Sequence, residues 1–167
     1  MSTPDVFQVV LGLAAFLCTL ATGLVLIFAI VVMPGLGTLG DHAFLRAFQV
    51  IDRVIQRNQP VFIAVWIGAV VAVLLSAVIG FNRLEGAAWV VLLVAALIYL
   101  FGVQVPTFAI NIPLNNRLQG LNIDALDGES ARLERQIFEP RWNRWNLIRT
   151  ILGAITSILL IYLLAVG

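Results

Sequence analysis

Four long apolar segments alternate with three polar connections along the chain. The apolar segments cover residues 6–33, 61–81, 87–110 and 150–167. Each is close to or above the roughly 20 residues that a helix needs to cross the hydrocarbon core of a bilayer. The first would be about 42 Å long, so it must tilt or project beyond the core. The pattern predicts an all-α membrane protein, a bundle of four transmembrane helices forming a single membrane domain over residues 1–167.

The connection between the first two spans has a different hydrophobic period. Its apolar side chains in residues 42–57 recur at helical spacing on one face: Phe44, Ala47, Phe48, Ile51, Val54 and Ile55. Arginines and glutamines occupy the other positions. Asp41, directly after Gly40, is placed to cap the start of this segment. We expect an amphipathic helix at the membrane interface or over the mouth of the bundle.

The other two connections differ greatly in length. Residues 82–86 are few enough for a tight antiparallel hairpin. In the third connection, residues 119–128 resemble a loop and residues 129–138 a short charged helix. Pro140 lacks an amide hydrogen, so we expect a break or a first turn there before the last span.

Composition agrees with a membrane location. Of the 167 residues, 61% are apolar and 11% are charged, whereas soluble domains have about 25% charged residues. The mean hydropathy is +1.02. These values exclude a disordered chain, a disulfide scaffold and a nucleic-acid-binding domain. The single histidine, His42, cannot supply a haem held by two histidines or a site with paired Glu-x-x-His ligands.

The charges predict an orientation. All ten basic residues are arginines, and nine of them lie in the first and third connections. Only Arg83 lies on the opposite side, which also holds both termini. Arginine-rich connections stay in the cytoplasm. We therefore expect an integral membrane protein, in a bacterial inner membrane, with both termini outside and the two large connections cytoplasmic.

The second span carries small residues at strict intervals of four: Ala64, Gly68, Ala72, Ser76 and Gly80. A stripe of this kind lets two helices approach closely in lipid. We expect this approach inside the bundle, and a homo-oligomer contact is the alternative. Trp66, near the start of the same span, is typical of an interfacial aromatic residue.

Polar side chains gather where the third span ends and the fourth begins. The members of this cluster are Asn111, Asn115, Asn116, Trp142, Trp145, Asn146 and Arg149. Asn111 and Asn115 are spaced i, i+4 and share one helical face. Trp142, Asn146 and Arg149 are spaced i, i+4, i+7 and share another. Antiparallel packing of the two spans would bring both faces to the same level.

Such a cluster suits a planar, lipophilic guest that carries oxygen atoms. Indoles stack on aromatic rings, amides bond to carbonyl and phenol groups, and Arg149 can stabilise a phenolate or an enolate. The alternative is purely structural. Tryptophan and arginine anchor helix ends at the membrane interface, and asparagines can satisfy backbone groups freed by Pro113.

Four segments carry a resemblance to a known family: MPGL at 33–36, FQVID at 48–52, NIPLN at 111–115 and WNRWNLIR at 142–149. In this order they resemble the anthrone oxygenase-like family of small four-helix membrane proteins, most of them uncharacterised. The most specific parts are Asn-x-Pro-x-Asn and Trp-x-x-x-Asn-x-x-Arg, which belong to the polar cluster. The resemblance implies oxidation of an anthrone to an anthraquinone without a conventional cofactor.

Two functions follow as hypotheses. The first is a membrane-embedded oxygenase or oxidoreductase that acts on a planar phenolic or anthrone-type substrate, with no cofactor and no metal. Arg149 and the asparagines would hold the substrate's oxygen atoms, and Trp142 and Trp145 would stack on its ring. The second is a non-catalytic lipophile-binding or accessory membrane subunit. A transporter is poorly supported, because no charged residue lies in the middle of a span.

His42 is the first candidate for a catalytic base, because its side chain titrates near neutrality. The alternative is a solvated residue in the first turn of the interfacial helix. Asp41 and Asp52 are weaker candidates, since a helix cap and a surface charge explain them better.

Overall fold

The computed structural model describes residues 5–166; residues 1–4 and 167, which include the last residue of the predicted fourth span, lie outside the described range. Between residues 5 and 166 the chain is helical and contains no strand. Four helices are long and apolar enough to cross a membrane: Val6–Gly37, Pro60–Gly80, Gly86–Gln119 and Gly128–Val166. The predicted all-α bundle is confirmed, and the chain is an integral membrane protein.

The first long helix consists of α1 (Val6–Ile27), the π-helical segment η1 (Phe28–Val32) and α2 (Met33–Gly37). The π-helical turns come directly before Pro34, whose ring and missing amide hydrogen disturb regular α-helical bonding. The helix continues past the predicted end of the span because α2 packs on the following amphipathic helix.

The third long helix contains α5 (Gly86–Leu97), η2 (Ile98–Gln104), η3 (Thr107–Asn111) and α6 (Ile112–Gln119). Two of these segments, η2 and η3, are π-helical and flank Pro106. The wider turns absorb the disturbance that the proline causes. The helix therefore extends beyond the apolar stretch, and the predicted end of the third span lies inside η3.

The predicted amphipathic helix is present as α3 (Asp41–Gln56). Gly40, not Asp41, occupies the N-cap position, so the predicted capping role of Asp41 is wrong. The Asp41 carboxylate instead accepts a hydrogen bond from Arg135, 3.1 Å away. This contact ties the start of α3 to the last helix.

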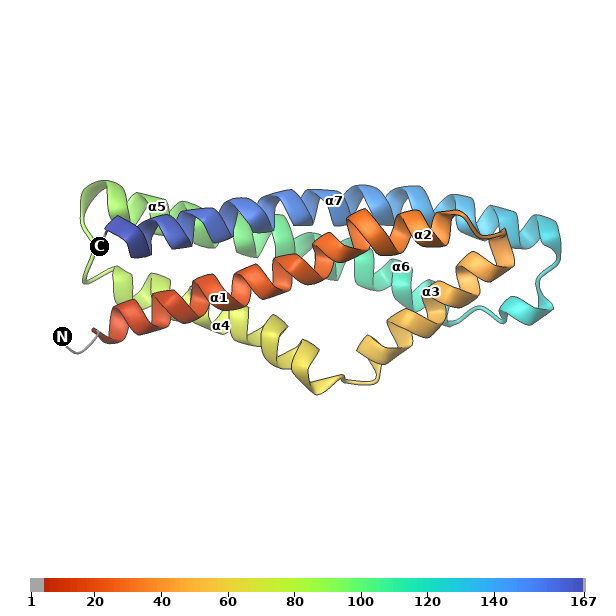
Figure 1. Ribbon diagram of the computed structural model, residues 1–167, viewed down its shortest axis with the longest axis horizontal. Helices are drawn as coiled ribbons and strands as arrows, with labels where there is room; N and C mark the ends of the chain where they lie inside the picture. The colour runs from red at the N-terminus through yellow and green to blue at the C-terminus, as the bar shows by residue number, and fades with distance from the viewer. Residues whose placement is uncertain (1–4, 167) are drawn as a thin grey trace.

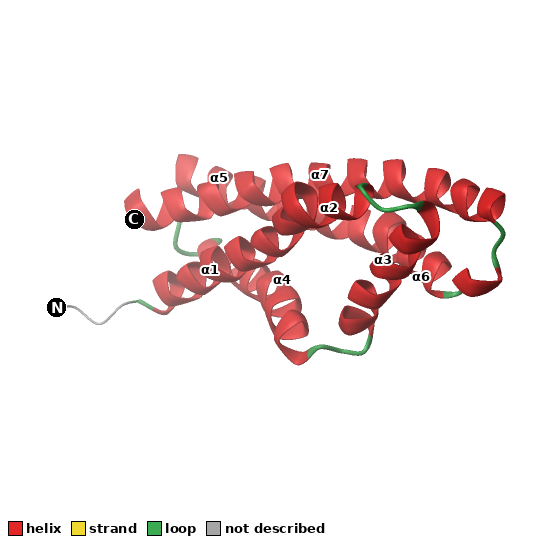
Figure 2. Cartoon of the chain, turned by 45° about the vertical axis from the view of Figure 1, so that its right-hand side comes forward, coloured by secondary structure: helices red, strands yellow, loops and turns green. Residues whose placement is uncertain are grey.

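The helix α4 (Pro60–Gly80) follows α3 after the short loop 57–59. The side chain of Gln59 accepts a hydrogen bond from the Phe62 amide and caps the helix. From this loop α3 and α4 diverge like the arms of a V, and each arm leads back to the long helices (Figure 1, Figure 2).

The last helix, α7 (Gly128–Val166), runs for 39 residues without interruption. The predicted break at Pro140 is wrong, and the charged segment and the fourth span form one helix. Pro140 is exposed and removes a single backbone hydrogen bond. Its neighbours Phe138 and Trp142 are buried against α3, and this packing outweighs the lost bond. A 3₁₀ turn, η4 (Ile123–Ala125), precedes α7.

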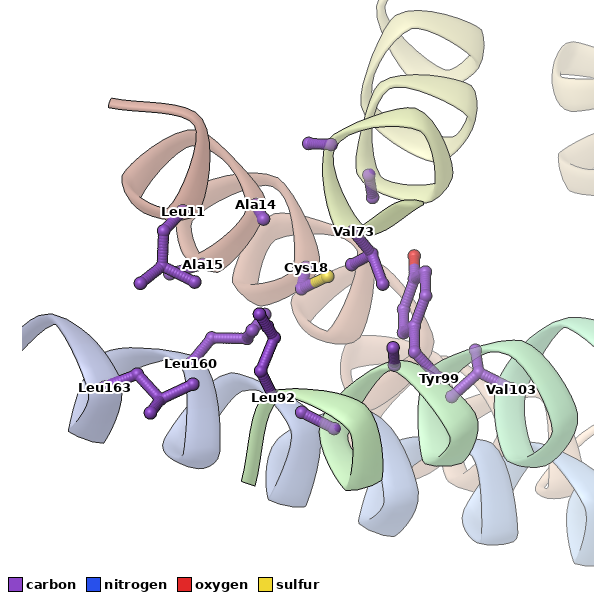
Figure 3. Close-up of a cluster of buried hydrophobic side chains, with 14 of the residues drawn as sticks. Leu11, Ala14, Ala15, Cys18, Val73, Leu92, Tyr99, Val103, Leu160 and Leu163 are labelled. Carbon is purple, nitrogen blue, oxygen red and sulfur yellow. The ribbon is translucent and has the colours of Figure 1, made fainter. Parts of the chain in front are cut away.

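Residues of α1, α4, α5, η2 and α7 form one of two packed clusters, which we call the closed half. Its centre consists of small and aliphatic side chains together with Cys18 and Tyr99. Figure 3 shows Leu11, Cys18, Val73, Leu92, Tyr99 and Leu160 directed toward one another from these helices.

The small-residue stripe of α4 serves the closed half. A Cβ atom on Gly68 would lie 3.1 Å from Leu17 of α1, and one on Gly80 would lie 2.5 Å from Leu92 of α5. Ala72 is also buried, whereas Ala64 is exposed. The stripe therefore contacts neighbouring helices of the same chain, as we expected.

The second cluster, which we call the open half, joins α2, α3, α6 and α7. Its side chains are larger and more often aromatic than those of the closed half. Its buried members include Met33, Phe44, Phe48, Leu118, Phe138 and Trp142. Because α3 lies away from α4, the two clusters are separated on one side of the bundle by a space that neither fills.

Candidate functional site

A cavity of about 940 Å³ lies between the arms of the V and the long helices. Most of its lining side chains are apolar, and the polar ones come from α3, the loop 57–59, η3, α6 and α7. They are Asp52, Asn58, Gln59, Thr107, Asn111, Asn115, Asn146 and Arg149. This volume is at the upper end of those found for small-molecule sites, so the cavity has room for a molecule of several fused rings.

The cavity opens at the outer surface of the bundle. Val61 and Ile67 on α4 and Phe108 on η3 line it and are 65%, 57% and 64% exposed. All three are apolar and belong to helices that are able to span a membrane. The opening is therefore a lateral one with an apolar rim, suited to a guest that arrives from lipid.

Arg149 provides the positive charge of the cavity wall. It is 5% exposed, and its two terminal nitrogens donate to Thr107 Oγ1 at 3.0 Å and Asn146 Oδ1 at 2.9 Å. Its Nε is buried without a partner. Among residues 5–166 no carboxylate pairs with it. A buried cation without a counter-ion is costly, and an anionic ligand would remove that cost.

Two asparagines complete the wall around Arg149. Asn146 donates from Nδ2 to the carbonyl of Val25 at 2.9 Å. This bond fixes the orientation of the amide, so that Oδ1 faces Arg149. Asn111 donates to the carbonyl of Trp142 at 3.4 Å, and its Oδ1 is buried without a partner. The side chains of Arg149 and Asn111 both line the cavity, and each keeps one buried polar atom without a partner.

A second polar chain crosses the cavity wall closer to α3. Trp142 donates from its indole nitrogen to Asn115 Oδ1 at 2.8 Å, and Asn115 donates from Nδ2 to Asp52 Oδ1 at 2.8 Å. Asp52 is 3% exposed, so our interpretation of it as a surface charge is wrong. Burial raises the pKa of Asp52, and hydrogen bonds from Gln119, Gln56 and Asn115 oppose that shift.

The sequence contains a signal for Asp52 that we did not use. Phe44, Phe48 and Asp52 follow one another at intervals of four, so they lie on one face of α3. Both phenylalanines are buried, and the same face therefore buries the carboxyl group. An acid in line with two core aromatics is a better site candidate than one among arginines.

Aromatic side chains form two opposite parts of the cavity lining. Trp142 lies between Phe28 and Phe48, with ring centroids 5.6 and 5.3 Å away. Across the cavity, Phe62 and Trp66 of α4 stack at 5.5 Å with an interplanar angle of 10°. We did not identify the α4 pair from sequence, because an apolar span with one tryptophan is also typical of an interfacial anchor.

Several predicted site residues lie elsewhere. His42 is exposed, and its ring nitrogen lies 3.0 Å from the Leu126 carbonyl, as expected for the solvated alternative. Asn116 is exposed and accepts a hydrogen bond from Gln56. Trp145 is half-buried and does not line the cavity. The structure does bring together the other five members of the predicted cluster at the cavity wall: Asn111, Asn115, Trp142, Asn146 and Arg149.

The donor set of the cavity suits an organic ligand. In the part of the chain that the structure describes, no group of three His, Cys, Asp or Glu side chains could hold a metal ion. The amide, guanidinium and indole groups of the wall can bond to carbonyl, phenol or enolate oxygens.

Fold and cavity together define a small helical membrane protein with a laterally open, mostly apolar cavity that has several polar groups in its wall. A family model described as Anthrone oxygenase matches residues 51–159, which is more than half of the chain. The chain therefore belongs to the anthrone oxygenase family, and the family indicates an oxygenase-like role. The match includes Asp52 and every polar member of the cavity wall. No curated protein and no solved structure matches the chain.

Proposed function

We propose that the protein is a membrane-embedded oxygenase that uses dioxygen to oxidise a planar, lipophilic substrate of the phenolic or anthrone type. One observation carries this proposal: Arg149 is a buried cation without a carboxylate partner among residues 5–166, and it stands in the wall of a large, mostly apolar cavity. The family match adds the oxygenase-like role.

The shape of the cavity suits a flat ring. Phe28, Phe48 and Trp142 provide aromatic surface on one side, and Phe62 and Trp66 provide it on the other. Offset and edge-to-face contacts of aromatic rings contribute about 0.5–1.5 kcal/mol each beyond the burial of apolar area. The apolar rim admits both a lipophilic substrate and dioxygen, which dissolves readily in hydrocarbon.

Oxidation of such a substrate by dioxygen needs a group that stabilises an anion. It needs no separate reductant, because the substrate anion itself reduces dioxygen. An anthrone carries a carbonyl group across its central ring from a methylene group. Loss of one methylene proton gives an enolate, whose charge is largely on the oxygen, and this electron-rich anion can reduce dioxygen. One oxygen atom then remains on the former methylene carbon as a carbonyl, and the other leaves as water with the two hydrogens.

Arg149 is the group that would hold the enolate oxygen. Its contacts to Thr107 and Asn146 hold the guanidinium group in place in the cavity wall, so its charge is preorganised. Preorganised donors of this kind contribute about 10²–10³ in kcat. Asn111, which also lines the cavity, would bond to a neighbouring phenolic hydroxyl of the substrate.

Oxygen uptake by the purified full-length protein, with anthrone or a reduced quinone as substrate, tests the proposal. We expect Arg149→Ala to lower the rate about 100-fold. Arg144→Ala is the matched control, because Arg144 is on the same helix, is exposed and does not line the cavity. Equal rates of oxygen uptake for wild type and Arg149→Ala would contradict the proposed oxygenase function. A lipophilic ligand that co-purifies without any oxygen uptake would instead favour a non-catalytic lipophile-binding or accessory subunit.

A further inference from the structure

Asp52 is the only carboxylate in the cavity lining among residues 5–166. It is almost fully buried, and no arginine or histidine of the described chain pairs with it. All of its hydrogen-bond partners are neutral amides. A buried acid that lacks a cation has no role in charge pairing, so its presence in the wall needs another explanation.

The side-chain amides of Asn115 and Gln119 have fixed orientations next to Asp52. The indole nitrogen of Trp142 can only donate, so it holds the oxygen of Asn115 and directs the Asn115 NH₂ group at Asp52. Gln119 donates from one NH₂ group to both the Gln49 carbonyl, at 2.9 Å, and Asp52 Oδ2, at 2.9 Å. Because a carbonyl can only accept, this amide is fixed as well.

A third donor completes the arrangement. Gln56 Nε2 lies 2.7 Å from Asp52 Oδ2, so Oδ2 accepts two hydrogen bonds and Oδ1 accepts one. Neither oxygen faces an acceptor to which a protonated carboxyl group could donate. The surroundings therefore present Asp52 as an acceptor, and the side that remains available for a proton is the side that lines the cavity.

We propose that Asp52 is the proton acceptor of the reaction and removes the acidic methylene hydrogen of the bound substrate. This inference rests on the proposed function. The C–H bond breaks, its electron pair moves through the ring to the oxygen held by Arg149, and the proton forms an O–H bond on the Asp52 carboxylate. The proton later leaves with the reduced oxygen in the water that is formed.

The positions of the two charged groups agree with the symmetry of such a substrate. Asp52 is joined to Trp142 through Asn115. Arg149 lies seven residues further along α7, about 10 Å along the helix axis. The acceptor and the cation are therefore held at separate points of the cavity wall, as a ring with its methylene and carbonyl groups on different edges requires.

The environment of Asp52 also suits a base. Burial raises the pKa of its carboxyl group, with the three amide bonds acting in the other direction. A carboxylate with a raised pKa is a stronger base than a solvated one, and a positioned base contributes about 10²–10⁴ in rate.

Hydrogen exchange without oxygen isolates this step from the oxidation. Anthrone is incubated with purified protein in deuterated buffer under anaerobic conditions, and deuterium at the methylene carbon is followed by NMR. We expect wild type to accelerate exchange above the uncatalysed rate and Asp52→Asn to lower this acceleration at least 100-fold. Asp124→Asn is the matched control, because Asp124 is an exposed acid in η4 and should leave exchange unchanged.

Each outcome has a separate meaning. The inference is supported if the Asp52→Asn variant binds anthrone but does not exchange the methylene hydrogens of the anthrone. Binding is measured by quenching of tryptophan fluorescence. Asp52→Asn that exchanges and consumes oxygen like wild type overturns the inference and leaves the proposed function standing. Wild type that neither exchanges the hydrogens nor consumes oxygen overturns both.

A second variant avoids any loss of folding at the buried position. Gln56 is exposed, and Gln56→Leu removes one donor from the Asp52 carboxylate. The ionised form then loses stabilisation, so the acid limb of the pH–rate profile for exchange should move to higher pH. Arg53 of α3, Arg57 of the loop 57–59 and Arg117 of α6 are exposed and make no bond to Asp52. Arg149 is the other charged side chain of the cavity lining, and it makes no bond to Asp52 either. An unmoved limb would contradict the role of Asp52.

Discussion

In the closed half of the bundle, buried hydroxyl groups either bond to the backbone of their own helix or, at Ser76 and Tyr99, have no hydrogen-bond partner among residues 5–166, whereas in the open half polar side chains bond across helices. Thr156 donates to the Leu152 carbonyl and Ser157 to the Gly153 carbonyl, each four residues back. In the open half, Gln49 of α3 donates to the Leu118 carbonyl at 2.7 Å, 69 residues away in sequence.

The two halves therefore differ in how far the side chains of one helix depend on partners from another. A hydroxyl group bonded within its own helix makes no demand on the adjacent helix, so the closed half is free to pack by close contact of small and aliphatic side chains. In the open half, Gln49, Asn115 and Gln119 have their orientations set by partners from other elements. The bonds that stabilise the open half therefore also orient its polar groups, and this half supplies Asp52, Asn115 and Trp142 to the cavity wall.

The largest expected effect comes from the packing of the closed half. A Cβ atom on Gly153 would lie 2.5 Å from Thr22 Oγ1 and 3.4 Å from Thr22 Cβ. We expect Gly153→Ile to separate α7 from α1 and to lower the free energy of unfolding by about 3 kcal/mol, measured by unfolding in mixed detergent and denaturing surfactant. Gly12→Ile is the control, since nothing lies within 4 Å of that position. Similar losses at both positions would show that close contact is not what stabilises this half.

A slightly smaller effect is expected at the far end of the open half. Arg135 donates to the carbonyls of Gly37 and Leu39 at 3.0 and 2.8 Å, as well as to Asp41. We expect Arg135→Met to leave the two carbonyls without this donor and to lower stability by about 2 kcal/mol. Arg132→Met, an exposed arginine one turn away, should change little. Equal effects of the two variants would contradict the cross-helix role of Arg135.

The orientation of polar groups should matter more for activity than for stability. Trp142→Phe keeps the aromatic ring but removes the hydrogen that fixes Asn115. We expect oxygen uptake to fall about tenfold, equivalent to roughly 1.4 kcal/mol, with a small change in unfolding. Trp145→Phe should leave both unchanged, because Trp145 does not line the cavity. An unchanged rate in Trp142→Phe would mean that Asn115 needs no fixed orientation.

The smallest effect is expected at the outer tip of the closed half. Arg83 and Asp5 form an ion pair at 3.0 Å, with 57% and 42% of their side chains exposed. Exposed pairs contribute little, so Asp5→Asn should cost less than about 0.5 kcal/mol. A loss comparable with that of Gly153→Ile would mean that the closed half depends on its ends rather than on its contacts.

The spans were predictable from the sequence because the bilayer imposes both the length and the apolarity of a crossing helix. The ends of the helices were not. Pro140 favoured a break, and the burial of Phe138 and Trp142 against α3 kept α7 continuous instead. Tertiary contacts of this kind join residues about 90 positions apart, and local sequence does not show them.

The polar part of the site was predictable to the extent that helical spacing determines it. Trp142, Asn146 and Arg149 share a face on any α-helix, and the structure places all three in the cavity wall. Asp52 was misassigned because two of its three partners, Asn115 and Gln119, come from a distant helix. The apolar wall on α4 could not be predicted, because its residues resemble those of any span.

The continuity of α7 has a consequence for how substrate range can change. Trp142, Asn146 and Arg149 are fixed at helical intervals on an uninterrupted rod, so insertions in loops cannot alter their spacing. The facing wall on α4 is less restricted: Phe62 and Trp66 are half-buried and stack on each other, and the only side-chain hydrogen bond of Trp66 within residues 5–166 runs to Gln104 at 3.0 Å. Redesign for larger or smaller ring systems therefore belongs at Phe62 and Trp66, where side-chain volume can be altered while the oxygen-binding groups stay in place.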